Sequence, residues 1–486
     1  MPRLNTPHSR HTRLSSLAFI GAAIVSLTAC AALPDGPPAA TPRPIQGYSA
    51  AQSLAATAAP WPADAWWRHY GDLQLDQLMS EALAGAPSLA VAQARLERAQ
   101  AVVATTRAGT RPQLRGNLSL SEQKQSYNYL SPAAVTPKGW NDYGRGTLDF
   151  SWDLDFWGRN RAAIAAALSD VEAARADEAQ ARLTLAAAVA SGYAEYARLW
   201  TVQETAEAAL QVRNRTVELF RKRLENGLET LGSLRQVEAR RAMARAELVS
   251  AGEQIALQRD RLAALAGAGP DRGLALGHPR VDMSRDFGLP AQIPAQLVGR
   301  RPDITAARLR VEAALGRVDA ATAAFYPDVN LSAFAGLQSL GLSHLLERGA
   351  AIGSIGPAIT LPIFDGGRLR SQLRAQRADT DAAVASYDQA VVQALQEVAD
   401  IVASERALGA EIADTDEGVQ AAREAWQIQQ RRYAGGLSTY LEVLTAEDAW
   451  LANVRAQSDL RARALSLDIA LQRALGGGYR SDLCAP

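Results

Sequence analysis

Apolar residues recur at three- and four-residue spacings over one very long stretch of the chain, from residue 159 to residue 226. The stretch is dense in Ala, Leu, Glu, Gln and Arg, the strongest helix formers, and contains no proline. It predicts one helix of roughly 65 residues, about 100 Å long at 1.5 Å per residue, which is too long for a globular core. The apolar seam, which includes Val217, Phe220 and Leu224, must therefore pack on partner helices.

The chain then turns back. Asn226-Gly227 is a helix-stop signal, and the helical pattern resumes from about Leu231 to Ala266. Residues 158–268 are therefore predicted to form a very long helical hairpin.

The hairpin occurs twice. Proline is absent again between Ile363 and Ala485, and this run breaks at Gly435-Gly436. An offset of 209 residues places Gly227 on Gly436, and the same offset places Arg159 on Arg368. The chain is therefore predicted to be an internal duplication.

Between the helices the period of the pattern changes from 3.6 to 2. In residues 147–156, large apolar side chains alternate with Asp and Ser, which predicts a strand with one apolar and one acidic face. Residues 114–120 are its predicted partner, joined by a polar connection over residues 122–141. Residues 329–337 and 355–363 repeat the arrangement in the second half.

The N-terminus carries a short apolar run, residues 14–27, that follows three arginines and ends at Leu27-Thr28-Ala29-Cys30. The run is too short and too early for a transmembrane helix, and we interpret residues 1–29 as a signal peptide with a lipobox. A plain signal peptide that ends near a chance cysteine is the alternative. The resemblance to bacterial lipoproteins implies cleavage before Cys30 and acylation of that residue. Ala31 follows in place of the Asp that implies retention in the inner membrane.

The strand pattern fits a soluble sheet as well as an outer-membrane strand. The lipoprotein signal, and the position of each strand pair before a long helix, favour the membrane. Lipid admits only closed barrels, and bacterial barrels have at least eight strands, so four strands cannot close alone. Two copies would give eight strands and a filled interior, whereas three copies would give twelve strands and a lumen.

Composition and charge exclude several classes of function. The 486 residues include 51 Lys and Arg against 51 Asp and Glu, so the zero net charge gives no reason to expect nucleic acid as a partner. The two cysteines, Cys30 and Cys484, leave no disulfide framework in the mature chain. The mature histidines, His69, His278 and His344, lack metal-ligand spacing. No metal and no cofactor are therefore expected beyond the covalent lipid on Cys30.

The chain is not predicted to be an enzyme. Asp153 and Asp155 could be paired carboxylates, but their positions on one face of an alternating strand favour acids that face a lumen. Gly267-Ala268-Gly269 follows a helix rather than a strand, which is the wrong context for a dinucleotide-binding loop.

Several motifs together resemble those of the TolC-like outer-membrane factors, specifically the lipoprotein branch (NodT type) of tripartite efflux systems. They occur in the family's order and in both repeats, and they cover the chain from about Trp61 to Leu475. Each is weak alone and specific in combination: Leu27 to Cys30, Trp66 to Asp72, Trp152 to Arg159, Arg300-Arg301-Pro302-Asp303-Ile304, Phe325-Tyr326-Pro327, Leu361 to Arg368, Tyr433 to Leu437, and Tyr440 to Leu444.

The resemblance implies an α+β fold, mainly α, and internally duplicated. Long coiled-coil helical hairpins form a periplasmic α-barrel, and each protomer of a homotrimer gives four strands to an outer-membrane β-barrel, with a small equatorial region. The expected segments are the signal peptide 1–29, a lipid-anchored Pro/Ala linker 30–60, a first repeat 61–270 with a β-hairpin 112–156 and a helical hairpin 158–268, an equatorial segment 271–293, a second repeat 294–475 with a β-hairpin 327–364 and a helical hairpin 366–475, and a C-terminal tail 476–486.

The resemblance also implies a function. The chain would be the exit duct of a tripartite efflux pump, anchored in outer-membrane lipid and extending into the periplasm. It would passively conduct substrates from an inner-membrane pump of the RND type and a periplasmic adaptor. A type I protein-secretion duct uses the same fold, although the lipobox favours efflux. A non-channel periplasmic coiled-coil scaffold would explain the helices and the anchor but not the alternating strand.

The family further implies two sets of site residues near the hairpin tips. The adaptor-contact tips are Gly227, Leu228 and Thr230 in the first repeat and Gly436, Leu437 and Thr439 in the second. Both tips are also helix caps, and the repeated Gly-Leu-x-Thr favours a contact role in addition.

The channel aperture falls on Tyr433, Ser438 and Glu442, and a threefold ring of Glu442 would form a cation-favouring collar. Ser438 stands where the family has a basic residue, and Thr445 stands where the family can carry a second acid. The sequence therefore departs from the family at two positions that bear on the hydrogen bonds of the aperture.

Overall fold

A computed structural model describes residues 40–44, 47–50, 52–128, 134–281, 288–290 and 293–481. The predicted signal peptide, the predicted lipidation site Cys30, and Cys484 lie outside these residues. The chain divides into two compact units, of which the first contains Glu97–Glu172 and Leu309–Ala385 and the second contains Pro42–Leu96, Ala173–Arg308 and the chain from Ser386 onward. We describe each unit by itself.

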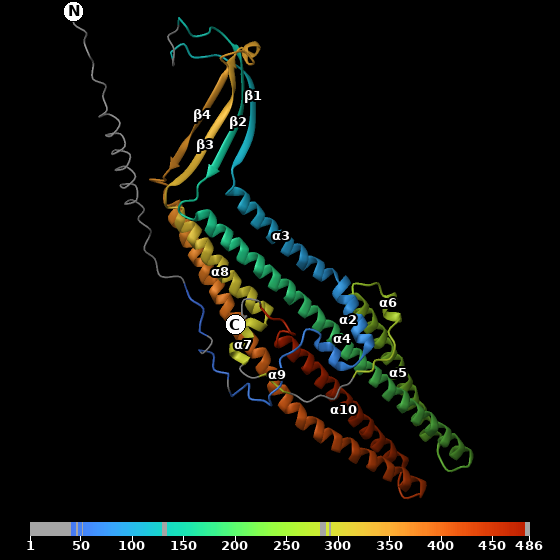
Figure 1. Ribbon diagram of the computed structural model, residues 1–486. Helices are drawn as coiled ribbons and strands as arrows, with labels where there is room; N and C mark the ends of the chain where they lie inside the picture. Colours follow the sequence, from blue (N-terminus) through green and yellow to red (C-terminus); the bar gives the residue numbers. More distant parts are fainter. Residues whose placement is uncertain are drawn as a thin grey trace, which may run out of the picture. The chain divides into compact units, whose positions relative to one another are not determined.

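The first unit contains a four-stranded antiparallel sheet with the strand order β1-β2-β3-β4 (Figure 1). The strands are β1 (Gln113–Gln123), β2 (Asn141–Asp153), β3 (Asp328–Leu340) and β4 (Ala351–Thr360). Strands of both repeats therefore form one sheet, with the central pair β2 and β3 contributed by different repeats. The predicted pairing of residues 114–120 with the strand before the long helix is confirmed, since Leu114 lies opposite Phe150 and Leu120 opposite Gly144.

The sheet has one apolar and one polar face, as the period-2 pattern predicts. The apolar face is exposed within a single chain: Leu118 is 72% exposed and Ile355 is 78% exposed. The register places these residues on that face: Leu114, Leu118, Leu120, Leu148, Phe150, Trp152, Leu331, Ile355 and Ile359. The opposite face carries Arg115, Asn117, Thr147, Asp149, Ser332 and Ser354.

Two strands end earlier than predicted. The strand expected over residues 147–156 ends at Asp153, because Asp155 leaves the sheet and accepts hydrogen bonds from the backbone N–H groups of Asn160 and Arg161, both at 3.0 Å. The expectation that Asp153 and Asp155 share one strand face is therefore wrong. Asp155 instead satisfies unpaired donors at the start of the following helix.

The second strand pair ends in a similar way. The strand expected to reach residue 363 ends at Thr360. Asp365 then accepts hydrogen bonds from the N–H groups of Gly367 at 3.0 Å and Leu369 at 2.8 Å. The bond from Leu369 is the main cause that lowers the pKa of Asp365 below its usual range.

Long helices follow each strand pair. In the first repeat these are α4 (Arg159–Glu225) and α5 (Leu231–Leu265), and in the second repeat they are α9 (Arg368–Ala434) and α10 (Tyr440–Ala474). The two repeats match in length, with 67 residues in α4 and in α9 and 35 residues in α5 and in α10. The predicted fold class, mainly α with a four-stranded sheet and an internal duplication, is confirmed.

Shorter helices complete the chain. They are η2 (Trp66–Tyr70), α2 (Leu73–Gly85), α3 (Pro87–Gly109), α6 (Asp271–Leu274), α7 (Ile293–Arg300), α8 (Pro302–Ala323) and η3 (Leu342–His344). Among the helices of the described residues, none combines the length and the apolar character needed to cross a membrane.

The core of the second unit is built around the aromatic residues of η2. Trp66 and Tyr70 are 2% and 1% exposed and belong to one cluster with Tyr193 and Tyr196 of α4. The tryptophan pair Trp66 and Trp67 therefore anchors this core. Asp72 begins α2 by accepting a hydrogen bond from the Gln74 N–H at 2.9 Å, and it also accepts one from the Tyr193 hydroxyl at 2.7 Å.

Candidate functional site

The two hairpin tips of the second unit have the same backbone geometry. Gly227 and Gly436 adopt positive φ angles of 72° and 73°. The Leu228 N–H donates to the Arg223 carbonyl at 2.8 Å, and the Leu437 N–H donates to the Arg432 carbonyl at 2.9 Å. Both tips are thus Schellman motifs, in which glycine takes the left-handed position after the helix.

The threonine of each tip begins the returning helix. Thr230 Oγ1 accepts a hydrogen bond from the Ser233 N–H at 3.2 Å. Thr439 forms a capping box with Glu442, whose Oε1 accepts from the Thr439 N–H at 3.4 Å and from its hydroxyl at 3.1 Å. The leucines that follow the glycines are exposed to solvent: Leu228 is 65% exposed and Leu437 is 73% exposed.

An aromatic cluster joins the two hairpins close to their tips. Phe220 of α4 is fully buried, and its ring meets that of Tyr440 edge-on at 4.3 Å between centroids. Tyr433 at the end of α9 lies 5.2 Å from Tyr440 and packs against the same cluster. Because these rings come from both repeats, the cluster ties the end of one hairpin to the other.

A polar contact between the hairpins accompanies the cluster. The Tyr433 hydroxyl donates a 2.7 Å hydrogen bond to Glu229 Oε1 in the tip loop of the first hairpin. The Arg223 guanidinium lies 4.7 Å from the centre of the Tyr433 ring, and its Nε is 3.8 Å from the same Glu229 oxygen. Burial, and then the bond to Glu229, raise the pKa of Tyr433 above its usual value. The hydroxyl therefore remains a protonated donor at neutral pH.

The structure brings one of the three predicted aperture residues into this contact. Tyr433 touches the first hairpin, whereas the exposed Glu442 caps α10 within its own repeat. The Ser438 hydroxyl is shielded from solvent and forms no hydrogen bond with any described residue.

Sequence reasoning missed a charged network farther along the hairpins. Arg213 of α4 lies 3.2 Å from Glu447 and 2.5 Å from Asp448 of α10, and Asp448 also pairs with Arg240 of α5. Arg213 and Glu447 are 6% and 1% exposed, so this ion pair is buried within a single chain. Burial raises the pKa of Glu447, and Arg213 opposes that rise.

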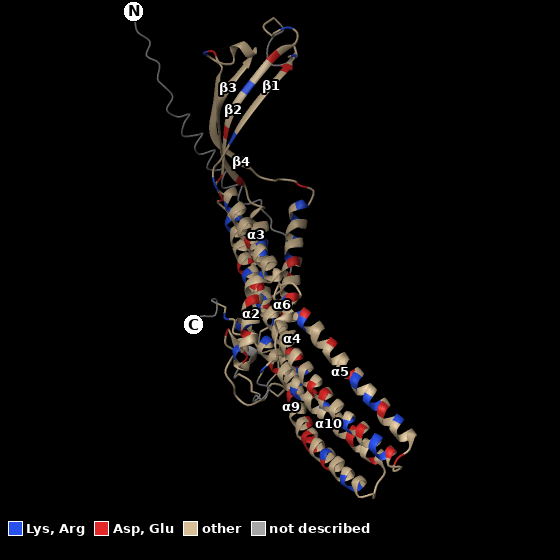
Figure 2. Cartoon of the chain, turned by 90° about the vertical axis from the view of Figure 1, so that its right-hand side faces the viewer, with Lys and Arg blue, Asp and Glu red and all other residues tan. Residues whose placement is uncertain are grey.

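A second ion pair joins α5 and α10. Glu247 pairs with Arg455 at 2.5 Å, seven residues beyond Arg240 and Asp448 in both helices and with the signs exchanged. Figure 2 shows charges of both signs along α5 and α10. The exchanged signs at a seven-residue spacing are the sequence signal that could have revealed this contact.

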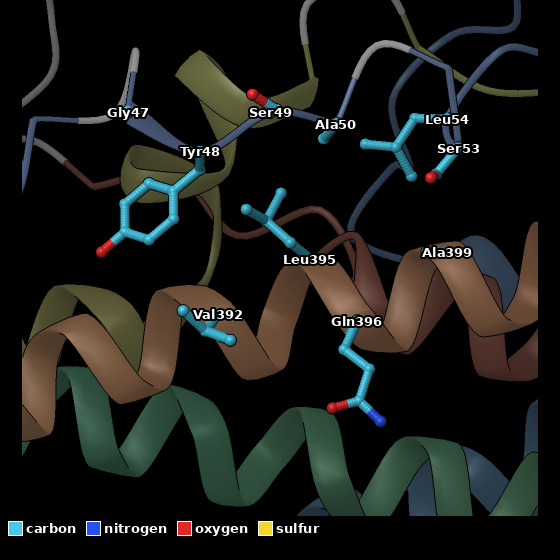
Figure 3. Close-up of a pocket in the computed structure, with 10 residues that line it drawn as sticks. All are labelled: Gly47, Tyr48, Ser49, Ala50, Ser53, Leu54, Val392, Leu395, Gln396 and Ala399. Atoms are coloured by element: carbon cyan, nitrogen blue, oxygen red, sulfur yellow. The ribbon is translucent and has the colours of Figure 1, made fainter.

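The described residues of the second unit form a cavity with an uncharged lining. A cavity of 340 Å³ lies between the segment from Gly47 to Leu54 and the α9 residues Val392, Leu395 and Gln396 (Figure 3). Its lining contains no charged side chain. Within the described residues, no group of three or more His, Cys, Asp or Glu side chains is placed to hold a metal ion.

Comparisons with known proteins give one consistent match. A family model described as outer membrane efflux protein matches residues 78–268 and 293–477. The crystal structure of the outer membrane protein VceC from Vibrio cholerae is 50% identical, with a TM-score of 0.81, covering 86% of this chain and 100% of that one.

Curated relatives agree with that match. The multidrug resistance outer membrane protein MdtP of Escherichia coli K12 is 33% identical over 433 residues, which are 87% of this chain and 88% of MdtP. The fusaric acid resistance protein FusA of Burkholderia cepacia is 36% identical over 371 residues, which are 75% of this chain and 69% of FusA.

Proposed function

Since this chain belongs to the outer membrane efflux protein family, we propose that three copies of it assemble into one channel that joins a periplasmic adaptor and an inner-membrane pump. The chain itself is an outer-membrane efflux channel, in a family of transport proteins. Beyond this, we propose a trimer, its partners, its lipid anchor and its gate.

The observation that carries the proposal is the two-faced sheet with two free edges. In the described part of the chain, β1 and β4 each pair on one side only. An exposed apolar face suits lipid, and the polar face suits a water-filled lumen. Free backbone groups on an edge strand are costly in lipid, which favours closure of β4 of one copy on β1 of the next. Three sheets of four strands would make a barrel of twelve.

The matching hairpin tips support docking of an adaptor. Three copies of a duplicated chain would present six tips, all with the Gly-Leu-x-Thr geometry of Gly227 and Gly436. A ring of adaptor hairpins could then make nearly equivalent contacts with both repeats through Leu228 and Leu437, with Thr230 and Thr439 setting the turn. The multidrug and fusaric acid resistance named in the relatives supports a pump for small toxic solutes. From the family resemblance we propose that this pump is of the RND type.

The contact between the two hairpins supports a gate at the tips. Tyr433, Ser438 and Glu442 would line the aperture in the closed trimer, and Glu442 would form its acidic collar. Opening would be an iris-like movement of the second hairpin near Gly436 that breaks the bond between Tyr433 and Glu229. Binding of adaptor and pump would drive this movement without covalent chemistry.

The lipobox supports a lipid anchor at Cys30. Acylation of its thiol and its amine would provide two or more chains, which hold a protein stably in a bilayer where one chain would not. The channel would thus be held in the outer membrane by both its barrel and its lipid.

Two measurements test the proposal. The mass of the detergent-solubilised protein should correspond to three acylated copies. The outer-membrane fraction should contain a heat-modifiable band of this trimer. In planar bilayers the Tyr433→Ala, Glu442→Ala double variant should conduct more than the wild type. A single-copy particle without a pore would refute the channel, whereas a trimer whose conductance is unchanged by the double variant would refute only the gate.

A further inference from the structure

The charged residues on the polar face of the sheet are unevenly distributed. Away from the strand ends, the charged side chains on this face are Arg115 on β1 and Arg145 and Asp149 on β2. The face of β3 from Asn330 to Gln338, and the whole corresponding face of β4, carry none. Two cations therefore stand against one acid in the middle of the sheet, and Figure 2 shows the remaining strands mostly uncharged.

The hydrogen bonds that Asp149 accepts come from neutral groups, and Arg145 also acts on it electrostatically. Asp149 Oδ2 accepts hydrogen bonds from the Asn117 amide at 2.6 Å and from the Thr147 hydroxyl at 2.7 Å. Arg145 instead lies over the ring of Phe334, at 5.6 Å from its centre. Arg115 stands opposite Asp149 in the register and is exposed. The ion pairs that the structure shows on this face join Arg159 to Asp153 and Asp328 at the strand ends, and they do not include Arg115 or Arg145.

Closure of the proposed barrel would leave this excess in place. The strand that would meet β1 is β4 of the next copy, and its polar face presents Ile352, Ser354, Gly356, Ala358 and Thr360. The neighbouring copy therefore adds no carboxylate beside Arg115. Three copies would carry six arginines and three Asp149 carboxylates in the middle of the sheets, an excess of three positive charges there, apart from Asp153 and Asp328, which pair with Arg159 at the strand ends.

We propose that the β-barrel segment is an anion-attracting filter, formed by Arg115 and Arg145 of three copies, that favours export of solutes bearing a carboxylate, phosphate or sulfate group. The inference rests on the proposed trimeric channel. A ring of like charge on a low-dielectric wall focuses its field into the lumen and raises the local concentration of counter-ions. The filter would act in series with the collar of Glu442, which has the opposite sign and lies at the hairpin tips.

The test measures ion selectivity in planar bilayers. The Tyr433→Ala, Glu442→Ala background removes the acidic collar, and reversal potentials in a KCl gradient at low ionic strength then give the chloride-to-potassium permeability ratio. Adding Arg115→Gln and Arg145→Gln should lower this ratio by about twofold or more. Adding Asp149→Asn should raise it. The charge-preserving Arg115→Lys, Arg145→Lys variant is the matched control and should keep the ratio of the background.

The outcomes separate this inference from the function on which it rests. Pores that conduct with the same ratio in the Gln, Asn and Lys variants overturn the filter and leave the channel intact. A trimer that forms no pore in any variant overturns both. If the Gln variant does not insert, the Asp149→Asn measurement decides, and an unchanged ratio there counts against the filter.

Discussion

Tyr433 and Glu229 belong to different repeats, 204 residues apart, yet the tyrosine hydroxyl donates a 2.7 Å hydrogen bond to the carboxylate. The bond joins the end of α9 to the tip loop between α4 and α5. Because Arg223 faces both partners, the contact combines a charged acceptor, a half-buried ring and a cation over that ring. Separation of the hairpins must break all three.

The first prediction concerns the hydroxyl group of Tyr433. Tyr433→Phe keeps the ring packed against Tyr440 but removes the donor to Glu229. A hydrogen bond to a charged group contributes about 1.5 to 3 kcal/mol, so the tips should open more often. Hydrogen exchange of the tip amides and single-channel open probability should both rise. Tyr326→Phe, in the first unit, changes a tyrosine that stacks on Trp157 through its ring and leaves the tip contacts intact, so it serves as the control. Equal behaviour of the two variants would contradict a latch.

The second prediction concerns the buried Glu447. Burial raises its pKa, so the folded protein binds this proton more tightly than the unfolded chain does. Its stabilising contribution is therefore present below the ordinary pKa of 4.5 and is lost as the pH rises through the folded-state value. The Glu447→Gln variant has no titrating group at this position and therefore lacks this dependence of stability on pH.

Thermal unfolding of the solubilised protein measures the difference. The unfolding temperature of the wild type, relative to that of Glu447→Gln, should rise as the pH falls from 7 toward 4.5. Other acids titrate in both proteins, so their effects largely cancel in the comparison. A relative fall on acidification would mean that the ion pair with Arg213 outweighs burial and lowers the pKa.

The helices could be predicted closely because their signals are local. The long helix expected over residues 159–226 is α4, and the caps at Gly227 and Gly436 lie where the stop signals predict. The helix depends on the propensity and periodicity of its own residues, and each cap depends on a glycine within one turn of the helix end. The pairing of the two strands within each repeat was predicted from their alternation and their order in the chain, whereas the pairing of β2 with β3 was not predicted.

The strand ends and the contacts between hairpins could not be predicted in this way. Asp155 continues the alternation of β2, and only its bonds to the start of α4 take it out of the sheet. The partners Tyr433 and Glu229 have no local signal, because their contact depends on how the two repeats pack. The buried pair of Arg213 and Glu447 is hidden for the same reason.

The third prediction tests the packing of β2 on β3. A Cβ atom at Gly336 would lie 2.1 Å from the Gly146 carbonyl oxygen, closer than the sheet allows. Gly336→Ala must therefore push the two strands apart, at a cost of about 1 to 3 kcal/mol or more. The amount of heat-modifiable protein in the outer-membrane fraction should fall. Gly356→Ala on β4, with no atom within 4 Å of the added Cβ, is the control and should leave it unchanged.

The last prediction tests the hairpin tips as the adaptor-contact surface. Leu228 and Leu437 are 65% and 73% exposed, so Leu228→Asp and Leu437→Asp should change the stability of the channel by no more than about 0.5 kcal/mol. A charge at an apolar docking position must be desolvated when a partner binds, so each variant should weaken cross-linking to a co-expressed periplasmic adaptor and the pair should abolish it. Leu274→Asp changes an equally exposed leucine on α6 and should leave cross-linking intact. Undiminished cross-linking in the double variant would place the adaptor elsewhere on the channel.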